Sequence, residues 1–228
     1  MTLIHAGRVR LNDGVCRDAE RPVRLDRDRI QVEDEPLTAA PKVYLALNKP
    51  RGVVTTASDE QDRRTVYDFL APGMPWVSPV GRLDKASEGL LLMTNDSEWA
   101  ARVLAPETHL EKTYHVQIAK IASADLPAAL MSGVRTVERE LLRAKAARIL
   151  RRGEKNTWLT VVLDEGKNRQ IRRMFEAEGI EVLRLVRVAI GPLELGNLAK
   201  GAWRPVSEAE KLALDAAMQR SSQKSIRE

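Results

Sequence analysis

The sequence is poor in the residues that crosslink a chain or bind metal ions. Cys16 is its only cysteine, so no internal disulfide can form, and no second thiolate ligand lies near it. The three histidines, His5, His109 and His115, do not cluster at the spacing of metal ligands. We therefore expect neither a structural metal nor a metal cofactor.

Long apolar runs and glycine-rich phosphate loops are also missing. No apolar stretch approaches the roughly 18 residues that a membrane span needs, and the first residues lack the charged-then-apolar layout of a signal peptide. Neither standard spacing of a phosphate-binding glycine loop occurs, which argues against nucleoside triphosphate and dinucleotide chemistry. We expect a cytoplasmic protein without a membrane partner, whose chemistry comes from its side chains.

Basic residues are in modest excess. The 228 residues include 37 lysines and arginines against 32 aspartates and glutamates, which gives a net charge of +5. This excess of positive charge favours a polyanionic partner. The length suits one large or two modest domains with a sizeable core.

A change in composition near residues 33–42 divides the chain. Two prolines and several small residues there separate short alternating segments from longer periodic ones. We predict an N-terminal module over 1–36, a linker over 37–42, a main domain over 43–215 and a disordered polar tail over 216–228. In the N-terminal module, GRVRLNDGVC predicts a hairpin that turns at Asp13–Gly14, because this dipeptide tolerates positive φ angles.

Predicted strands and helices alternate irregularly in the main domain. Apolar patterning predicts two strands around a Pro-Gly turn within 42–56, and further strands at 90–94, 112–121, 157–166, 182–190 and 192–195. Helices are predicted at 95–105, capped by Asp96 or Ser97, at 122–134, from Asn168 onward, and at 207–220. Hairpin-type turns between neighbouring strands favour an α+β fold with a mixed, largely antiparallel sheet and flanking helices.

The segment VGRLDKASEGLLLMTND, residues 80–96, places Asp84 just before an apolar run. A lone loop aspartate is usually a turn or cap residue. Here Arg82 lies on the same side of an extended segment, and Gly81 and Gly89 allow a close approach of the backbone. A nearby guanidinium favours the ionised carboxylate that a nucleophile or base requires. Asp84 is therefore the candidate catalytic residue.

The helix that begins near Asn168 has a basic side. Arg169, Arg172 and Arg173 recur at three- and four-residue spacing, and the remaining positions form a mainly apolar side. A solvated basic face is the simplest interpretation of this pattern. Phosphate binding is the alternative.

Four motifs resemble, in order, those of the RsuA-type bacterial ribosomal-RNA pseudouridine synthases. GRLDKASEGLLLMTND (81–96) resembles the catalytic signature of that family, with the signature aspartate at Asp84 and with Ser87 where a threonine is more usual. LNKPRGV (47–53) resembles its opening strand and turn, EKTYHV (111–116) its tyrosine motif, and DEGKNRQIRRMF (164–175) its basic helix. The resemblance continues to about residue 207.

The resemblance implies the pseudouridine synthase fold and the isomerisation of a uridine in rRNA, without a cofactor or metal. The N1 glycosidic bond breaks, the uracil turns, and its C5 bonds to the ribose C1′. By motif position, Asp84 is the catalytic carboxylate, Arg172 pairs with it, and Tyr114 stacks on a flipped base. The remaining residues expected to bind the substrate are Arg82, Leu185 as an apolar wall, and Lys49, Arg51, Lys167, Arg169 and Arg173 as RNA contacts.

Several points stay open. HAGRVRLNDG (5–14) resembles part of an S4 RNA-binding domain, so the module over 1–36 is expected to be partly S4-like. The segment 187–207 favours 23S rRNA as the substrate, with 16S rRNA as the alternative, and we expect a monomer. Two other classes of protein are considered: a non-catalytic rRNA-binding or assembly factor on the same scaffold, and a uracil-releasing glycosylase. A glycosylase would need a second carboxylate, and the nearest, Glu88, is expected on a surface loop.

Overall fold

The computed structural model describes residues 3–24, 27–37, 40–56, 59–61 and 63–225. The chain separates into two compact units, Met1–Pro41 and Lys42–Glu228. The boundary between them lies inside the predicted linker, 37–42.

The smaller unit is a four-stranded antiparallel sheet in the order β2-β1-β3-β4. Its strands are β1 (Val9–Leu11), β2 (Gly14–Cys16), β3 (Ile30–Val32) and β4 (Glu35–Pro36). The first hairpin turns on Asn12 and Asp13, whose φ angles are 51° and 68°. The predicted turn at Asp13–Gly14 was therefore wrong by one residue, because Asn and Asp also tolerate the left-handed region and Gly14 begins β2.

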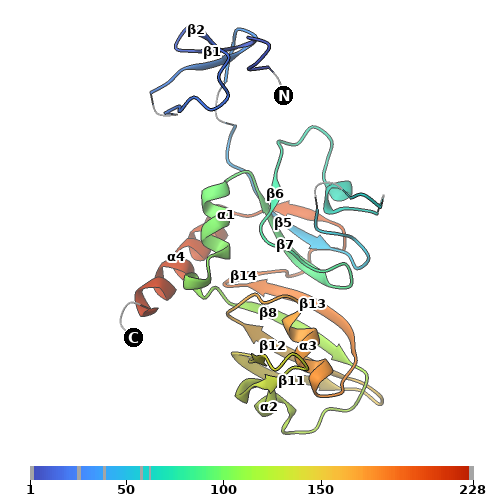
Figure 1. The fold of residues 1–228 in the computed structure, drawn as a ribbon. Coiled ribbons are helices and arrows are strands. Elements are labelled where there is room, and N and C mark those ends of the chain that lie inside the picture. The colour runs from blue at the N-terminus through green and yellow to red at the C-terminus, as the bar shows by residue number, and fades with distance from the viewer. Residues whose placement is uncertain (1–2, 25–26, 38–39, 57–58, 62, 226–228) are drawn as a thin grey trace. The chain divides into compact units, whose positions relative to one another are not determined.

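The larger unit is built on a nine-stranded sheet (Figure 1). Seven strands follow the order β11-β12-β8-β13-β7-β5-β15, while β14 pairs with β13 and β6 with β7. Their bounds are β5 (Tyr44–Lys49), β6 (Ser78–Pro79), β7 (Glu88–Thr94), β8 (Lys112–Ile118), β11 (Ala146–Arg152), β12 (Thr157–Leu163), β13 (Val182–Ile190), β14 (Leu193–Glu194) and β15 (Trp203–Pro205). Within the described residues, β13 and β7 run parallel and the other pairs of this sheet run antiparallel. The predicted α+β class with a mixed, largely antiparallel sheet is confirmed.

Four α-helices flank the sheets of this unit: α1 (Ser97–Leu104), α2 (Leu126–Ser132), α3 (Gln170–Ala177) and α4 (Glu208–Ser225). Asp96 caps α1 as predicted, since its side chain accepts a hydrogen bond from the backbone N–H of Trp99 at 3.1 Å. A short pair, β9 (Val134–Arg135) and β10 (Leu141–Leu142), lies apart from the main sheet. Among the residues that the structure covers, no helix is both long and apolar enough to cross a bilayer.

The tail prediction was wrong as far as residue 225. Helix α4 continues to Ser225, whereas we predicted a helix only to residue 220 and a disordered tail over 216–228. The segment 216–225 contains neither glycine nor proline, so nothing in it stops a helix. Residues 226–228 lie outside the described residues.

The two halves of the sheet have separate cores, and β5 and β7 are buried on both faces. On one face Ala46, Leu90 and Leu92 pack with Trp99 of α1 and Leu214 of α4. On the other face the intervening residues of β5 and β7 pack with Val53, Val66, Val77 and Leu83. A third cluster joins β8, β12 and β13 to α2 and α3 (Figure 1). The parallel β7–β13 pair connects the two halves.

This connection depends on one glycine. Gly89 of β7 lies opposite Arg187 of β13 and has a φ angle of 108°. A Cβ atom at position 89 would lie 2.3 Å from the backbone oxygen of Arg187. Only glycine permits this approach.

Candidate active site

A cavity of about 730 Å³ lies beside β8 and β13, next to the loop that precedes β7. Asp84 reaches it from this loop, Tyr114 from β8 and Leu185 from β13. Arg82, Lys167 and Arg169 also line it. The structure therefore brings six of the predicted site residues to one cavity.

The loop that carries Asp84 is fixed through its backbone. Five consecutive carbonyl oxygens, those of residues 83–87, accept hydrogen bonds from groups outside the loop. The donors are the Thr55 hydroxyl to Leu83 (2.8 Å), Lys49 Nζ to Asp84 (3.1 Å), the Gly52 N–H to Lys85 (2.7 Å), Arg172 Nη2 to Ala86 (3.1 Å) and Lys49 Nζ to Ser87 (2.9 Å). A fixed loop holds the carboxylate in one place, as catalysis requires.

Lys49 is not the RNA contact that we predicted. Its side chain is fully buried at the end of β5, where Nζ donates to the carbonyl oxygens of Pro50, Asp84 and Ser87. Burial lowers the pKa of Lys49 to about 8, against the opposing charges of Asp84 and Glu88. Lys49 therefore positions the Asp84 loop through hydrogen bonds to its backbone oxygens.

The lowered pKa predicts a pH dependence of stability. Between about pH 8 and pH 10.5 the unfolded chain holds a proton on Lys49 that the folded chain has lost, so the free energy of unfolding rises with pH. Linkage sets the total rise at roughly 3 kcal/mol at most. Urea unfolding of the wild type and of Lys49→Met across this window measures it, since contributions from other groups cancel in the difference. Parallel pH profiles for the two proteins would contradict the prediction.

Arg172 lies behind the cavity wall. Its guanidinium donates to the backbone oxygens of Ala86 at 3.1 Å and of Val182 at 3.3 Å. Burial and the positive charge of Arg169 lower its pKa, while the charge of Asp84 acts in the opposite direction. The predicted pairing with Asp84 is thus a charge interaction, and no hydrogen bond joins the two side chains in the part of the chain described here.

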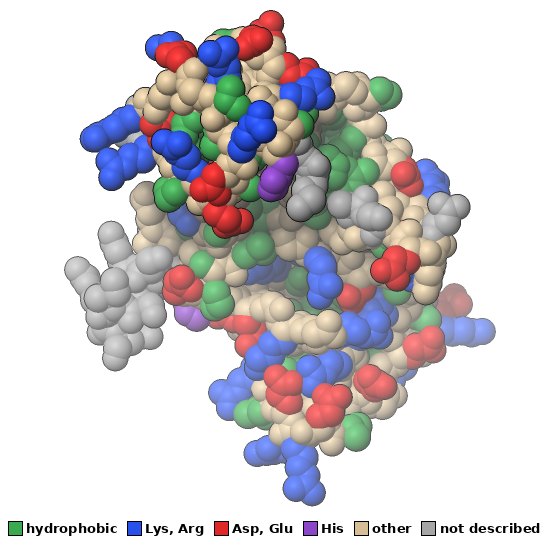
Figure 2. Space-filling view, turned by 45° about the horizontal axis from the view of Figure 1, so that its top comes forward, with side chains coloured by type: hydrophobic (Ala, Val, Ile, Leu, Met, Phe, Trp, Pro, Cys, Tyr) green, Lys and Arg blue, Asp and Glu red, His purple; other side chains and the backbone are tan. Residues whose placement is uncertain are grey.

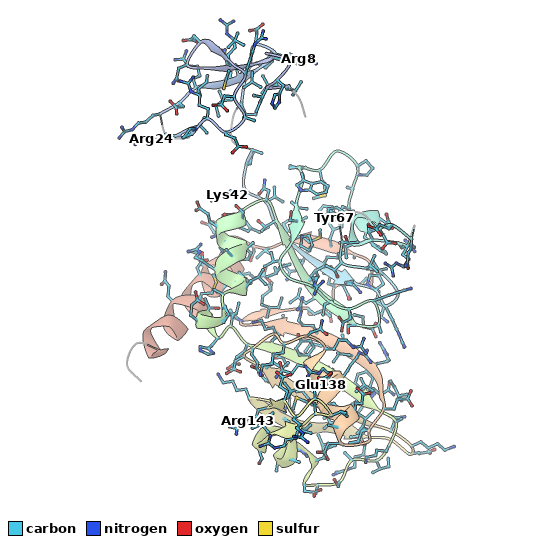
Figure 3. All side chains as sticks on the ribbon, in the orientation of Figure 1. Arg8, Arg24, Lys42, Tyr67, Glu138 and Arg143 are labelled. Atoms are coloured by element: carbon cyan, nitrogen blue, oxygen red, sulfur yellow. The ribbon has the colours of Figure 1, made fainter. Side chains whose placement is uncertain are left out.

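Arg173 was predicted as a phosphate contact, and the structure places it elsewhere. It pairs with Glu138 and Glu140 at 2.5 and 2.6 Å, and Figure 3 labels Glu138 beside α3. Successive helical residues point about 100° apart, and Arg172 and Arg173 accordingly have different partners. Figure 2 shows the same intermixing more widely, with acidic and basic side chains interspersed over the face it presents.

The three remaining cations that we predicted to contact RNA have exposed side chains. Arg169 is exposed at the start of α3, and no ion pair of the described residues includes it. Lys167 contacts Glu140 and Glu165, each at 3.3 Å. Arg51 is exposed and donates to the Leu183 oxygen at 3.4 Å.

Glu88 is buried, not on a surface loop as we predicted. It lies in β7 with 3% of its surface exposed and pairs with Lys200 at 2.7 Å and Arg184 at 2.8 Å. Burial opposes ionisation, but these hydrogen bonds outweigh it and lower the pKa of the Glu88 carboxyl. Both its oxygens are committed to these partners, which leaves it unsuited to act on a ligand in the cavity.

Of the lysines and arginines that line the cavity, Lys112 and Arg187 were not predicted from the sequence. A signal for both was present, because alternate residues of a strand share a face. Lys112 is two residues before Tyr114 in β8, and Arg187 is two residues after Leu185 in β13. The identification of Tyr114 and Leu185 as pocket residues thus pointed to two basic neighbours.

The arrangement suits a flat group attached to a polyanion. Asp84 is half-buried and has no ion pair within the described residues, so its carboxylate is free to act on a ligand. The Tyr114 ring offers a stacking surface, and the cations at the rim offer contacts to negative charge. No group of three or more His, Cys, Asp or Glu residues in the described part of the chain could hold a metal ion.

Comparisons with known proteins identify the family of this chain. A family described as RNA pseudouridylate synthase matches residues 43–177. The chain is 35% identical over 209 residues to the "Ribosomal large subunit pseudouridine synthase B" of Bacillus subtilis (strain 168), covering 91% of this chain and 85% of the relative. It is also 35% identical to an "Uncharacterized RNA pseudouridine synthase" of Aquifex aeolicus (strain VF5), over 91% of this chain and 84% of that one. A solved "pseudouridylate synthase" superposes with a TM-score of 0.67 and 32% identity over 93% of this chain and 90% of its own.

Proposed function

This chain belongs to the RNA pseudouridylate synthase family, and we propose that it isomerises a specific uridine of ribosomal RNA with Asp84 as the catalytic carboxylate. One observation carries the proposal. Asp84 lines the same cavity as Tyr114 and Leu185, on a loop whose carbonyl oxygens are bound by Lys49, Thr55, Gly52 and Arg172.

In this proposal the target nucleotide is flipped out of its helix and its uracil enters the cavity. Unstacking a base costs a few kcal/mol, and stacking on an aromatic ring returns roughly 1 to 3 kcal/mol. Tyr114 is the aromatic ring of the cavity wall, and it is only partly buried. We therefore assign the stacking contact to Tyr114 and the apolar wall beside it to Leu185.

Isomerisation is favoured over hydrolysis by the state of the other carboxylates. Glu88 is bound by Lys200 and Arg184. Two further carboxylates line the cavity: Glu165 is bound by Lys167 and Gln170, and Asp164 pairs with Lys145 at 3.8 Å. Hydrolytic glycosidases generally need a second carboxylate that is free to activate water or protonate the leaving group. Mass spectrometry separates the two reactions, because isomerisation leaves the mass of the RNA unchanged and hydrolysis removes the base.

We propose 23S rRNA as the substrate. The proposal is supported by the Bacillus subtilis relative, which is named as a large-subunit enzyme and matches 91% of this chain. Carbodiimide labelling and primer extension on rRNA from a deletion strain would locate the missing pseudouridine. A missing modification in 16S rRNA would reassign the subunit, and complete modification of both would refute the proposed function.

The two arginines that we expected to bind phosphate have different surroundings in the structure. Arg169 is exposed at the cavity, whereas Arg173 is neutralised by Glu138 and Glu140. We expect Arg169→Ala to weaken RNA binding and to reduce the slope of log K against log salt by about 1, and Arg173→Ala to leave the slope unchanged. Equilibrium binding at several salt concentrations measures both slopes. Equal slopes in the two variants would contradict this prediction.

We also propose that the smaller unit binds RNA as a partly S4-like module. Its sequence supports this proposal through the resemblance of residues 5–14 and through its many arginines. Some of these are paired within the unit, as Arg10 is with Asp34 and Arg29 with Asp13.

A further inference from the structure

Arg187 is a buried cation without an acidic partner. Only 6% of its surface is exposed, yet it lines the cavity. Its Nε donates to the Leu90 oxygen at 2.7 Å, while Nη2 is buried and has no hydrogen-bond partner among the residues that the structure describes. No ion pair of the described residues includes Arg187. A buried charge in this condition is costly unless a ligand supplies the missing partner.

Two more cations lie close to Arg187. Burial lowers the pKa of Lys112, and the charge of Arg187 adds to that effect while Asp164 opposes it. The charge of Arg187 also acts on Lys49, whose ammonium is held by backbone oxygens. Positive charge is therefore concentrated around Arg187. Two of these cations, Lys112 and Arg187 itself, line the cavity, and this favours an anionic ligand.

The position of these cations indicates which part of the substrate they meet. Arg187 and Tyr114 are directly opposed on the neighbouring strands β13 and β8, so their side chains share one face of the sheet. Lys112 and Leu185 occupy the same face by strand alternation. A flat group stacked on Tyr114 lies next to Arg187, whereas the sugar-phosphate chain stays nearer the exposed rim.

We propose that Arg187 and Lys112 form a subsite that stabilises the negative charge of the uracil after it leaves the ribose, an inference that rests on the proposed function. When the C1′–N1 bond breaks, both its electrons stay on N1, and the charge spreads to O2 and O4. The electron-poor C1′ is left facing Asp84. Bond formation from C5 to C1′ uses an electron pair of the uracil anion, after which C5 loses its proton and N1 gains one, so the net change is an isomerisation.

The test compares Arg187→Met and Lys112→Met with the wild type in single-turnover reactions on an RNA fragment that holds the target uridine. Removal of one donor to a developing anion typically costs about 10²- to 10³-fold in rate. We expect a loss of this size for Arg187→Met and about tenfold for the less buried Lys112→Met, with RNA affinity and its salt slope unchanged. Arg187→Lys, which keeps the charge, should recover part of the rate.

A second substrate separates this role from a structural one. A 5-fluorouridine at the target carries a more acidic base, which needs less stabilisation as it leaves. We expect cleavage of its glycosidic bond to be impaired less by Arg187→Met than cleavage at uridine. A purely structural defect would slow both substrates equally, and this result would overturn the proposal.

Two other outcomes would also overturn it. A loss of RNA affinity with a salt slope reduced by about 1 would show a phosphate contact instead. An unchanged rate in Lys112→Met would show that Lys112 does not belong to the subsite. If thermal unfolding shows that Arg187→Met does not fold, the rate of Lys112→Met tests the proposal instead. Failure of the proposed function is distinct, since the wild type itself would then form no pseudouridine.

Discussion

The Asp84→Asn variant should fold normally, bind RNA with unchanged affinity and form no measurable pseudouridine. An amide keeps the size and most of the local hydrogen bonding of the carboxylate, but it is neither a nucleophile nor a base at neutral pH. The loop itself should not move, because its carbonyl oxygens are bound from outside by groups such as Lys49 and Arg172. We therefore expect the rate to fall by several orders of magnitude while binding survives.

Single-turnover conversion at saturating RNA, followed by carbodiimide labelling, measures this loss. Lys85→Ala is the matched control, because Lys85 follows Asp84 in the same loop, has an exposed side chain and is anchored only through its backbone oxygen. It should retain the wild-type rate. Near wild-type conversion by Asp84→Asn would mean that position 84 is only a turn residue, since asparagine serves as well as aspartate in that role.

A second large effect is expected from Gly89→Ala. The added Cβ would lie 2.3 Å from the backbone oxygen and 2.8 Å from the backbone nitrogen of Arg187, at a φ angle of +108° that side chains rarely adopt. Backbone atoms cannot rotate away, so β7 and β13 must separate. We expect a loss of about 2 to 4 kcal/mol in the free energy of unfolding from overpacking and backbone strain together.

Urea denaturation measures this loss, and the activity of the folded fraction reports whether the cavity has changed shape. Gly166→Ala is the control for stability, since nothing lies within 4 Å of a Cβ at that position and its φ is not in the left-handed region. It should change the free energy of unfolding little. Equal stability of the two variants would show that the β7–β13 contact adjusts freely.

Local patterning was enough to predict most of the fold. Alternation in β8 and β13 and the continuous apolar run of β7 are periodic signals, and the cap of α1 is a local contact between Asp96 and Trp99. The strands β11 and β15 were missed. Three of the seven residues of β11 are arginines, which obscure its apolar alternation, and the three residues of β15 carry too little periodicity to identify a strand. In the first hairpin the turn falls on Asn12–Asp13 rather than on the predicted Asp13–Gly14, because Asn and Asp also adopt positive φ angles.

Burial of charged residues was much harder to predict. Lys49 is followed by a Pro-Arg-Gly turn, which suggests exposure, but its acceptors Asp84 and Ser87 come from another part of the chain. Glu88 is buried for a similar reason, because Arg184 and Lys200 reach it from remote segments. Such partners appear only when the chain has folded, so the motif was enough to propose Asp84 as the candidate catalytic residue, whereas the roles of the residues that hold its loop were not predictable.

Because the Asp84 loop is anchored through its backbone, its shape does not depend on the identity of its exposed side chains. Every carbonyl oxygen from residue 83 to residue 87 is bound from outside, so the path of the loop does not depend on the side chains of Arg82 or Lys85, which are exposed. Those two positions are free to diverge during evolution without displacing the carboxylate. A scaffold built in this way can acquire new RNA targets by changes at the cavity mouth while its chemistry stays the same.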